Sequence, residues 1–254
     1  MERGFTSLLA LALLLLAPPA QASEPFRVFS MNLHCALGNW HARLDTVLDE
    51  LARERPDVMG FQEVCRNKKV DMARYLVDGL ESRGYHVAYW RTVDTHGTFF
   101  KYQEQLLVIS GRPVHGVEEG KLPSMPFLRN KYLGVQLDGQ WVVVTHLHFL
   151  LPQIRQFQAH KLVKLWSGRP VLLLGDFNTS GDAWELGRFA KRGWSSYFPG
   201  KTFPSDKPKK VFDGFLLSPE LAARVESAAA RRIFEGLADP PSDHLAVGLD
   251  LTLN

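Results

Sequence analysis

The chain of 254 residues is 45% hydrophobic and 22% charged, a composition typical of a packed globular protein, which excludes a disordered chain. The sequence contains no low-complexity segment and no internal repeat, which excludes repeat architectures. Its formal net charge of +3 permits a polyanionic substrate without requiring one.

The first residues predict an export signal. Arg3 precedes an apolar run over residues 8–17, and the small-residue pattern Ala20-Gln21-Ala22 follows. This run is shorter than the roughly 20 residues of a membrane-spanning helix, so a signal peptide cleaved after Ala22 is favoured over a membrane anchor. We therefore expect residues 1–22 to be the signal peptide, residues 23–254 to be one domain, and the protein to be secreted or periplasmic.

The rest of the chain alternates strand and helix patterns. In its first half the predicted elements are a strand at Phe26–Met31, a helix at Leu44–Arg53, a strand at Val58–Phe61, a helix at Val70–Glu81, and strands at Tyr85–Trp90 and Glu104–Ser110. In its second half they are strands at Tyr132–Leu137 and Trp141–Thr145, a helix at Ile154–Trp166, a strand at Val171–Leu174, a helix at Ala183–Lys191, and strands at Val211–Leu217 and Leu245–Leu251.

The central strands predict an α/β fold with two facing mixed sheets and helices outside. Strands such as Val171–Leu174 are apolar on both faces and must be covered on both sides. A doubly wound single sheet is the alternative, but Asp138-Gly139 predicts a hairpin, and several strands follow one another without a helix between them. No glycine-rich phosphate loop follows the first strand, which argues against nucleotide binding of that kind.

Polar side chains occur where these apolar strands end, which is the position where α/β folds bind ligands. They are Asn32, Glu63, His146, Asp176 and Asn178, with Asp243 and His244 before the last strand. Each one alone has a structural explanation, because an Asn at a strand end is commonly a turn residue. Together they are the ingredients of metal-assisted phosphodiester hydrolysis.

Two kinds of group carry this hypothesis. The oxygens of Asn32 and Glu63 suit Mg²⁺ first, with Mn²⁺ and Ca²⁺ as alternatives, and no Cys/His cluster has zinc spacing. One histidine could activate water, and a second could protonate or hydrogen-bond the phosphate or leaving group, if each is supported by a carboxylate.

The sequence resembles the endonuclease/exonuclease/phosphatase superfamily from Phe26 to Leu251. The motifs that carry the resemblance occur in the family's order and are Met31-Asn32, Gln62-Glu63, Thr145-His146, Gly175-Asp176-Phe177-Asn178 and Ser242-Asp243-His244, with Arg155 and Gln158 in the helix after His146. The resemblance implies a four-layer α/β sandwich of two mixed sheets, dependence on a divalent metal and cleavage of phosphate esters.

Within that superfamily the segment Tyr102–Leu107 looks like the pancreatic-type deoxyribonucleases. That likeness implies that Glu104 pairs with His146 and that Asp213 pairs with His244. The implied roles are catalysis by His146, His244, Glu104, Asp176, Asn178 and Asp213, metal binding by Asn32, Glu63 and Asp243, and substrate binding by Tyr102 and Arg129. His34 and His148 lie two positions from site residues and are assigned no role.

Three functions remain open at this point. A nuclease acting on DNA or RNA is favoured by the Tyr102/Glu104 pattern and by basic clusters, which are otherwise solvated loops, at Lys207, Lys209 and Lys210 and at Arg129 and Lys131. Apolar residues at Phe149–Pro152 and Phe99-Phe100 favour a sphingomyelinase or phospholipase that touches a phospholipid membrane. A catalytically silent binding module is the third alternative, and no obligate protein partner is inferred.

Two cysteines follow site residues, Cys35 after Asn32 and Cys65 after Glu63. Both lie at the same ends of strands that should be neighbours, and exported proteins meet oxidising conditions. We therefore predict a Cys35–Cys65 disulfide. In the deoxyribonucleases an arginine that reaches the minor groove tends to occupy the position of Cys65, whereas here Arg66 lies one position later.

Overall fold

The computed structural model describes residues 24–96, 101–126 and 128–254. The signal peptide over residues 1–22 and the Phe99-Phe100 pair lie outside the described residues, so both remain predictions. None of the helices in the described ranges is both long and apolar enough to span a membrane.

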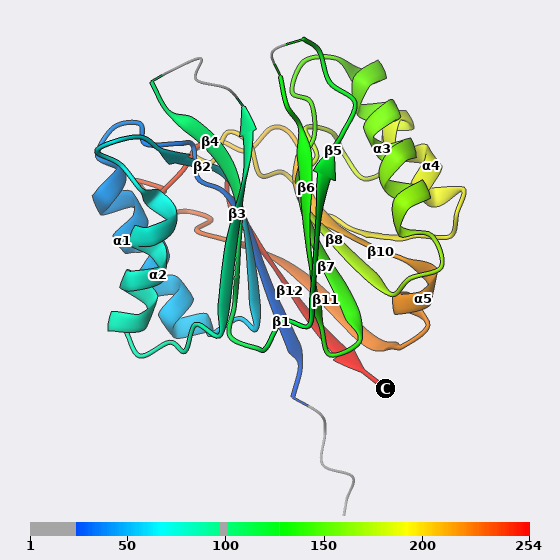
Figure 1. Cartoon of the computed structure of the whole chain (residues 1–254), viewed down its shortest axis with the longest axis horizontal. Helices are drawn as coiled ribbons and strands as arrows, with labels where there is room; N and C mark the ends of the chain where they lie inside the picture. The colour runs from blue at the N-terminus through cyan, green and yellow to red at the C-terminus, as the bar shows by residue number, and fades with distance from the viewer. Residues whose placement is uncertain (1–23, 97–100, 127) are drawn as a thin grey trace, which may run out of the picture.

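Two six-stranded mixed sheets form the centre of the molecule (Figure 1). The first contains, in spatial order, β11 (Val225–Ile233), β12 (Ala246–Leu253), β1 (Phe26–Asn32), β2 (Val58–Arg66), β4 (Gln103–Ser110) and β3 (Tyr89–His96). The second contains β5 (Gly116–Lys121), β6 (Lys131–Leu137), β7 (Gln140–His146), β8 (Val171–Asp176), β10 (Asp213–Leu217) and β9 (Ser195–Tyr197). Strands β1 and β2 pair in parallel, as do β7 and β8, and the other pairs are antiparallel.

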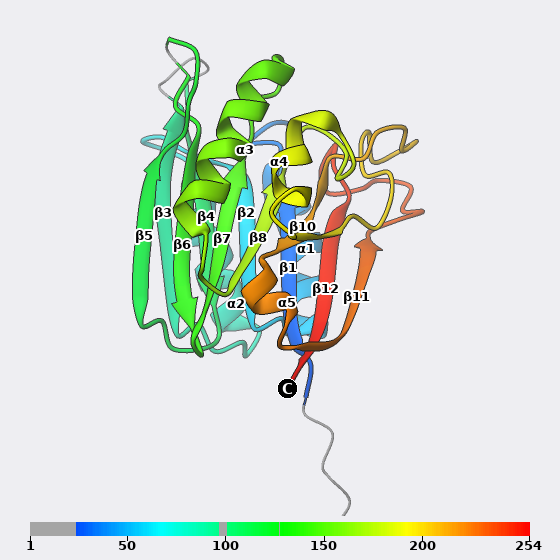
Figure 2. The same cartoon turned by 90° about the vertical axis from the view of Figure 1, so that its right-hand side faces the viewer.

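Helices cover the outer faces of both sheets, so the predicted four-layer sandwich is confirmed (Figures 1 and 2). Helices α1 (Trp40–Glu54) and α2 (Met72–Ser82) pack on the first sheet. Helix α3 (Pro152–Trp166), a 3-10 turn η1 (Trp184–Leu186) and α4 (Gly187–Ala190) pack on the second, and α5 (Pro219–Ala222) follows β10. A separate apolar cluster fills the space between the sheets.

The two sheets approach closely at Gly60 in β2. A Cβ atom there would lie 2.4 Å from Leu174 Cδ1 and 2.6 Å from Val144 Cγ2, both of the opposite sheet. Glycine at this position therefore sets the distance between the layers, and a side chain would push them apart.

Several predicted boundaries are wrong. The strand expected at Tyr85–Trp90 begins only at Tyr89, and the buried Tyr85 hydroxyl donates a hydrogen bond to the Pro56 carbonyl oxygen. The first helix begins earlier, at Trp40, because the Asn39 side chain accepts a hydrogen bond from the Ala42 amide. The helix expected at Ala183–Lys191 is divided into η1 and α4.

Strands β5, β9 and β11 were not predicted from the sequence. Strand β11 carries the Ala-rich sequence VESAAARRI, which favours a helix by intrinsic propensity. It is an edge strand held by antiparallel pairing to β12, so a tertiary contact overrides the local preference. Strand β5 is an edge strand too, with mostly polar and small residues that give no apolar alternation.

The predicted Cys35–Cys65 disulfide is confirmed. The two Cα atoms are 5.0 Å apart and the sequence separation is 30 residues. The bond ties the loop after β1 to the end of β2, and the Cys35 amide also donates a hydrogen bond to the Glu63 carbonyl oxygen at 3.1 Å. The disulfide therefore holds together two chain segments that carry site residues.

We expect the double replacement Cys35→Ala/Cys65→Ala to lower the free energy of unfolding by about 3–4 kcal/mol, because the bond closes a loop of this length in the unfolded chain. For a domain of this size that corresponds to a fall in melting temperature of roughly 6–16 °C. Calorimetry of the variant and of the oxidised parent measures the difference. An unchanged melting temperature would contradict the prediction.

Candidate active site

The site residues predicted from the strand ends meet at one edge of the sandwich, at the top in Figure 1. Asn32 ends β1 and Glu63 lies near the end of β2, while His146 and Asp176 end the parallel strands β7 and β8. Asp213, at the start of β10, is the direct pairing partner of Asp176. Because both sheets contribute, the site lies across the junction between them.

Asp176 is the centre of the cluster and is buried. Its Oδ2 accepts a hydrogen bond from Asn32 Nδ2 at 3.1 Å. The same oxygen lies 3.4 Å from His146 Nε2 and 3.7 Å from His244 Nε2. Its Oδ1 accepts a hydrogen bond from the Asn178 amide at 2.8 Å. One carboxylate therefore touches or approaches four predicted site residues.

Gly175 explains how this carboxylate is positioned. Its φ is +142°, and a Cβ atom would lie 2.0 Å from the Thr145 carbonyl oxygen of β7. Only glycine can be accommodated so close to a neighbouring backbone. Asn178 has a φ of 53°, a left-handed conformation that asparagine tolerates better than most residues. Its Nδ2 donates to the Leu147 carbonyl oxygen.

His146 lies beside Glu104, the expected partner. Nδ1 of His146 is 3.7 Å from Glu104 Oε1, which is too long for a strong hydrogen bond and makes this an electrostatic pair. Burial alone lowers the pKa of His146, but the carboxylates of Glu104, Asp176 and Glu63 outweigh it and raise the pKa to about 9. These carboxylates therefore favour the charged form of the imidazole.

His244 pairs with Asp213, which is also as expected. His244 Nδ1 is 2.8 Å from Asp213 Oδ2, and the buried Thr202 hydroxyl donates to the same oxygen at 2.5 Å. Burial alone lowers the pKa of His244, but the carboxylates of Asp213 and Asp176 outweigh this effect and raise the pKa to about 10. The ring of Phe203 packs against the imidazole with centroids 4.8 Å apart. The pair is thus fixed on several sides.

Glu63 lies in an irregular part of β2. The register with β4 shifts between Phe61 and Val64, and Glu63 has a φ of 52°. This bulge allows its Oε1 to accept a hydrogen bond from Asn32 Nδ2 at 2.9 Å. Burial raises the pKa of Glu63, His146 counteracts this, and the nearby carboxylates of Glu104 and Asp176 raise it further.

Asp243 is held differently from the other predicted metal ligands. Its Oδ1 is 2.9 Å from His34 Nδ1 and also accepts a hydrogen bond from the Ser242 hydroxyl at 3.3 Å. Burial acts to raise the pKa of Asp243, but the hydrogen bond and positive charge of His34, the charge of His244 and the Ser242 hydroxyl together lower it. Ser242 also donates to the Asn32 carbonyl oxygen, which connects Asp243 to the end of β1.

The donor set of the site fits a divalent cation. The carboxylates of Asp176 and Asp213 each offer an oxygen within 4.8 Å of the other and of a His244 nitrogen, and all three residues are buried. Asp213 Oδ1 has no hydrogen-bond partner among the described residues, and a buried carboxylate oxygen requires one or a cation. Carboxylate and amide oxygens are also what Mg²⁺, Mn²⁺ or Ca²⁺ prefers. The second group of oxygens, from Asn32 and Glu63, adjoins Asp176.

The two predicted substrate-binding residues lie outside this hydrogen-bonded cluster. Tyr102 is half-buried and packs against the apolar cluster beneath α1 and α2. Arg129 is exposed, and the next residue, Asn130, donates a hydrogen bond to the His146 carbonyl oxygen at 2.9 Å. Arg129 therefore lies next to a residue that contacts the site backbone.

Several residues that hold the site in place were not predicted from the sequence, or were named there without these contacts. Thr202 gave no signal, because its contact with Asp213 depends on a loop whose path the sequence does not specify. His34 was noticed but given no role, and its partner Asp243 is distant in sequence. Arg155 and Gln158 support the chain after β7: Arg155 pairs with Glu185 at 2.8 Å, and Gln158 accepts from the His148 amide.

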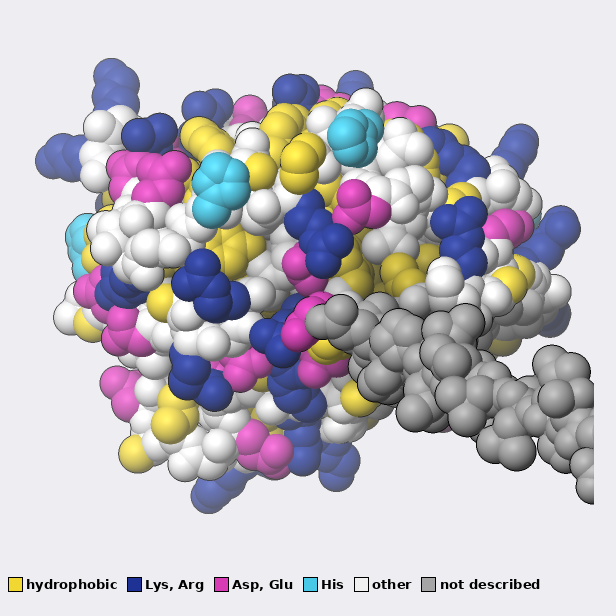
Figure 3. All heavy atoms as spheres, turned by 90° about the horizontal axis from the view of Figure 1, so that it is seen from below, with side chains coloured by type: hydrophobic (Ala, Val, Ile, Leu, Met, Phe, Trp, Pro, Cys, Tyr) yellow, Lys and Arg dark blue, Asp and Glu magenta, His cyan; other side chains and the backbone are white. Residues whose placement is uncertain are grey.

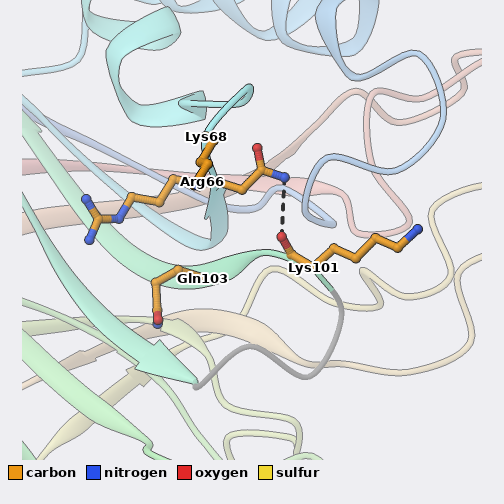
Figure 4. Close-up of a pocket in the computed structure, with 5 residues that line it drawn as sticks. Arg66, Lys68, Lys101 and Gln103 are labelled. Atoms are coloured by element: carbon orange, nitrogen blue, oxygen red, sulfur yellow. Dashed lines mark hydrogen bonds between the residues drawn. The ribbon is translucent and has the colours of Figure 1, made fainter.

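A basic pocket of about 390 Å³ lies where β2 ends and β4 begins (Figure 4). Its lining residues are Arg66, Asn67, Lys68, Lys101 and Gln103. Arg66 pairs with Gln103 across β2 and β4, one step beyond the Cys65–Glu104 pair. Asn67 Nδ2 donates to the Lys101 carbonyl oxygen at 3.2 Å, and the Arg66 and Lys101 side chains point to opposite sides in the close-up.

The cations of this pocket differ from those at the opposite end of the molecule. There, Lys and Arg are interspersed with Asp and Glu (Figure 3), as where Arg112 pairs with Asp57 at 2.7 Å and with Asp138 at 2.9 Å. Over the described residues, by contrast, neither Lys68 nor Lys101 has a carboxylate within ion-pair distance, and Arg66 has Asp94 at 3.6 Å. The positive charge at the site edge is therefore less neutralised.

Comparison with known proteins agrees with this geometry. The model of the "Endonuclease/Exonuclease/phosphatase family" matches residues 29–244. A curated relative, carbon catabolite repressor protein 4 homolog 3 of Arabidopsis thaliana, is 27% identical over 194 residues, which are 64% of this chain and 42% of the relative. The chain thus spans less than half the length of that relative.

Solved structures share the fold. An endonuclease/exonuclease/phosphatase family protein from Leptotrichia buccalis superposes with a TM-score of 0.73 at 20% identity, covering 89% of this chain and 99% of that one. The mannosyl-6-phosphatase Bt3783 of Bacteroides thetaiotaomicron superposes with a TM-score of 0.63 at 16% identity, with coverage of 89% and 99%. At these identities the likeness extends to the fold alone.

Proposed function

Because the chain belongs to the endonuclease/exonuclease/phosphatase family, we propose that this phosphoesterase is a nuclease that cleaves phosphodiester bonds of DNA or RNA with Mg²⁺ as its metal. The observation that carries the proposal is the basic pocket lined by Arg66, Lys68 and Lys101, whose lining residue Gln103 directly precedes Glu104 in β4. A phosphomonoester needs one anion site, whereas a nucleic acid presents further phosphates at regular spacing beyond the one that is cleaved.

Each group at the site has a role in this proposal. A divalent cation bound by the acidic cluster would neutralise the phosphate and stabilise the charge that develops during cleavage. With raised pKa values, His146 and His244 carry protons at neutral pH, so they donate hydrogen bonds to phosphate oxygens and one of them protonates the leaving oxygen. Asp176 Oδ2 lies between the two Nε2 atoms and then accepts the proton of the attacking water. The sequence had suggested that one of the two histidines would take this proton.

Glu104, Asp213 and Thr202 complete the arrangement as positioning groups. Glu104 stabilises the charged form of His146, and Asp213 fixes the ring of His244 by binding Nδ1, which leaves Nε2 directed at the cluster. We propose that Arg129, exposed near the site, contacts substrate phosphate, and that Tyr102, just before β4, helps to position the start of that strand and Glu104.

We also propose that the protein is exported, as the N-terminal pattern predicts. The Cys35–Cys65 disulfide supports this, because such bonds persist mainly in oxidising compartments.

One experiment separates the substrate classes. The mature chain with Mg²⁺ or Mn²⁺ is offered plasmid DNA, RNA, sphingomyelin vesicles and a sugar phosphomonoester in parallel. Cleavage of DNA or RNA at a rate well above the other two is the expected result. Turnover of the lipid or of the monoester alone would overturn the nuclease assignment, and no turnover of any of them would favour a binding module.

The basic pocket gives a second prediction. Replacing both Lys68 and Lys101 with Ala should weaken binding of a nucleic acid and reduce the slope of log binding constant against log salt by about two, since roughly one unit is lost for each phosphate contact removed. Fluorescence titration at several salt concentrations measures this slope. The double variant Lys191→Ala/Arg192→Ala, which removes exposed cations beyond α4, is the matched control. Equal slopes for both variants would show that the pocket does not bind the substrate.

A further inference from the structure

The loop after the catalytic strand β7 exposes apolar side chains. Phe149, Leu150 and Leu151 are 56%, 62% and 39% exposed, and Phe157 in α3 is 60% exposed. These four residues are called the apolar patch below. Large side chains of this kind exposed together are costly in water, so they indicate a surface that is covered when the protein works.

The exposure does not come from a loosely held backbone. The His148 ring nitrogen Nδ1 accepts hydrogen bonds from the amides of Leu150 and Leu151 at 3.2 and 3.1 Å. Arg155 donates to the His148 carbonyl oxygen at 3.0 Å, and Gln158 accepts from the His148 amide at 2.9 Å. The loop is therefore fixed from beneath, with its apolar side chains directed to solvent.

The charge of helix α3 indicates what covers the patch. Its sequence PQIRQFQAHKLVKLW contains no Asp or Glu. Residues His160, Lys161 and Lys164 are exposed on it, and in Figure 2 the helix faces the viewer on the outer surface of the second sheet. The exposed face of α3 thus combines apolar residues at one end with cations along the rest, a combination that fits the surface of an anionic bilayer.

From these observations we infer that the apolar patch and the cations of α3 bind an anionic lipid surface. The apolar side chains enter the headgroup region, and Lys161 and Lys164 attract the lipid phosphates. A nucleic acid fits the cations but leaves the aliphatic Leu150 and Leu151 without partners. The inference is independent of the proposed nuclease activity, because it concerns binding alone.

Docking would also place the catalytic site at the membrane. The patch begins three residues after His146, and Asn130 and Asn178 attach the backbone of residues 146 and 147 to the site. The site edge therefore moves together with the loop, and substrate held near the lipid surface would reach it over a short distance.

The test is flotation of the mature chain with phosphatidylcholine vesicles that contain phosphatidylglycerol, in EDTA so that turnover plays no part. Binding to these vesicles, weaker binding to pure phosphatidylcholine and loss of binding in high salt are expected. Phe149→Ser/Leu150→Ser should reduce partitioning by about tenfold or more, because burying one large apolar side chain contributes roughly a factor of ten. Lys161→Gln/Lys164→Gln should remove most of the preference for the anionic lipid.

Leu237→Ser, which replaces a residue 45% exposed elsewhere, is the matched control and should bind as the parent does. Melting curves and hydrolysis of a small soluble phosphodiester check that each variant is folded. No binding by the parent, or equal binding by the Phe149/Leu150 variant, would overturn the inference. The inference would also be overturned if light scattering showed that the parent is oligomeric and the Phe149/Leu150 variant is monomeric. The apolar patch would then bind a second copy of the chain.

Discussion

Replacing His244 with Ala should lower kcat/KM by about 10²–10⁴-fold, the range for loss of one proton-transferring group. The reason is that His244 is the imidazole most firmly fixed in the site, with Asp213 at 2.8 Å and the ring of Phe203 against it. His146→Ala should fall in the same range. The double variant should lose far less than the product of the two, since both imidazoles act on one phosphate.

Steady-state kinetics on the nucleic acid cleaved by the parent measure these effects. The exposed His86→Ala is the matched control and should retain full activity. Because removing a buried ring leaves a cavity, melting curves must show that each variant is folded at the assay temperature. A folded His244→Ala protein with the same turnover as the parent would mean that His244 takes no part in catalysis. The catalytically silent binding module would then be the better interpretation.

Glu63→Gln should reduce turnover by about 10²–10³-fold, which corresponds to the several kcal/mol that a metal ion contributes to charge stabilisation. The amide keeps the size of the side chain and an oxygen for the hydrogen bond from Asn32, so only the charge next to Asp176 is lost. Binding of Mg²⁺ or Mn²⁺, measured by titration calorimetry, should weaken in parallel. EDTA should abolish turnover of the parent.

The exposed Glu81→Gln in α2 removes the same charge elsewhere and is the control for this experiment. Excess metal should restore part of the activity of Glu63→Gln if weaker binding is the cause. Full activity in metal-free protein, or in Glu63→Gln without excess metal, would contradict the metal-dependent mechanism.

The strand-end positions of the site were predictable because they follow from a simple geometric rule. Parallel strands bring their carboxyl ends to one edge, so Asn32 and Glu63, and likewise His146 and Asp176, had to lie close in pairs. The apolar patterns of β1, β2, β7 and β8 are also buried on both faces, which made them easy to find. The disulfide follows from the same placement.

Other contacts could not be predicted, since they depend on loops and edges. The Thr202 hydroxyl reaches Asp213 from a loop closed by the Phe203–Lys210 bridge, and no periodic pattern encodes that path. The Ala-rich β11 is a strand only because β12 lies beside it. The sequence motif placed Asp243 with the metal ligands, and the contact of its Oδ1 with His34 emerges only when β1 and the last loop are brought together.

Because the site is divided between the two sheets, catalytic activity requires both sheets to be packed together. Glu63 and Glu104 belong to one sheet, and His146, Asp176 and Asp213 belong to the other. Neither sheet carries the complete site, so a molecule in which the two sheets have separated is inactive. Activity should therefore be lost on heating no later than the contact between the layers at Gly60.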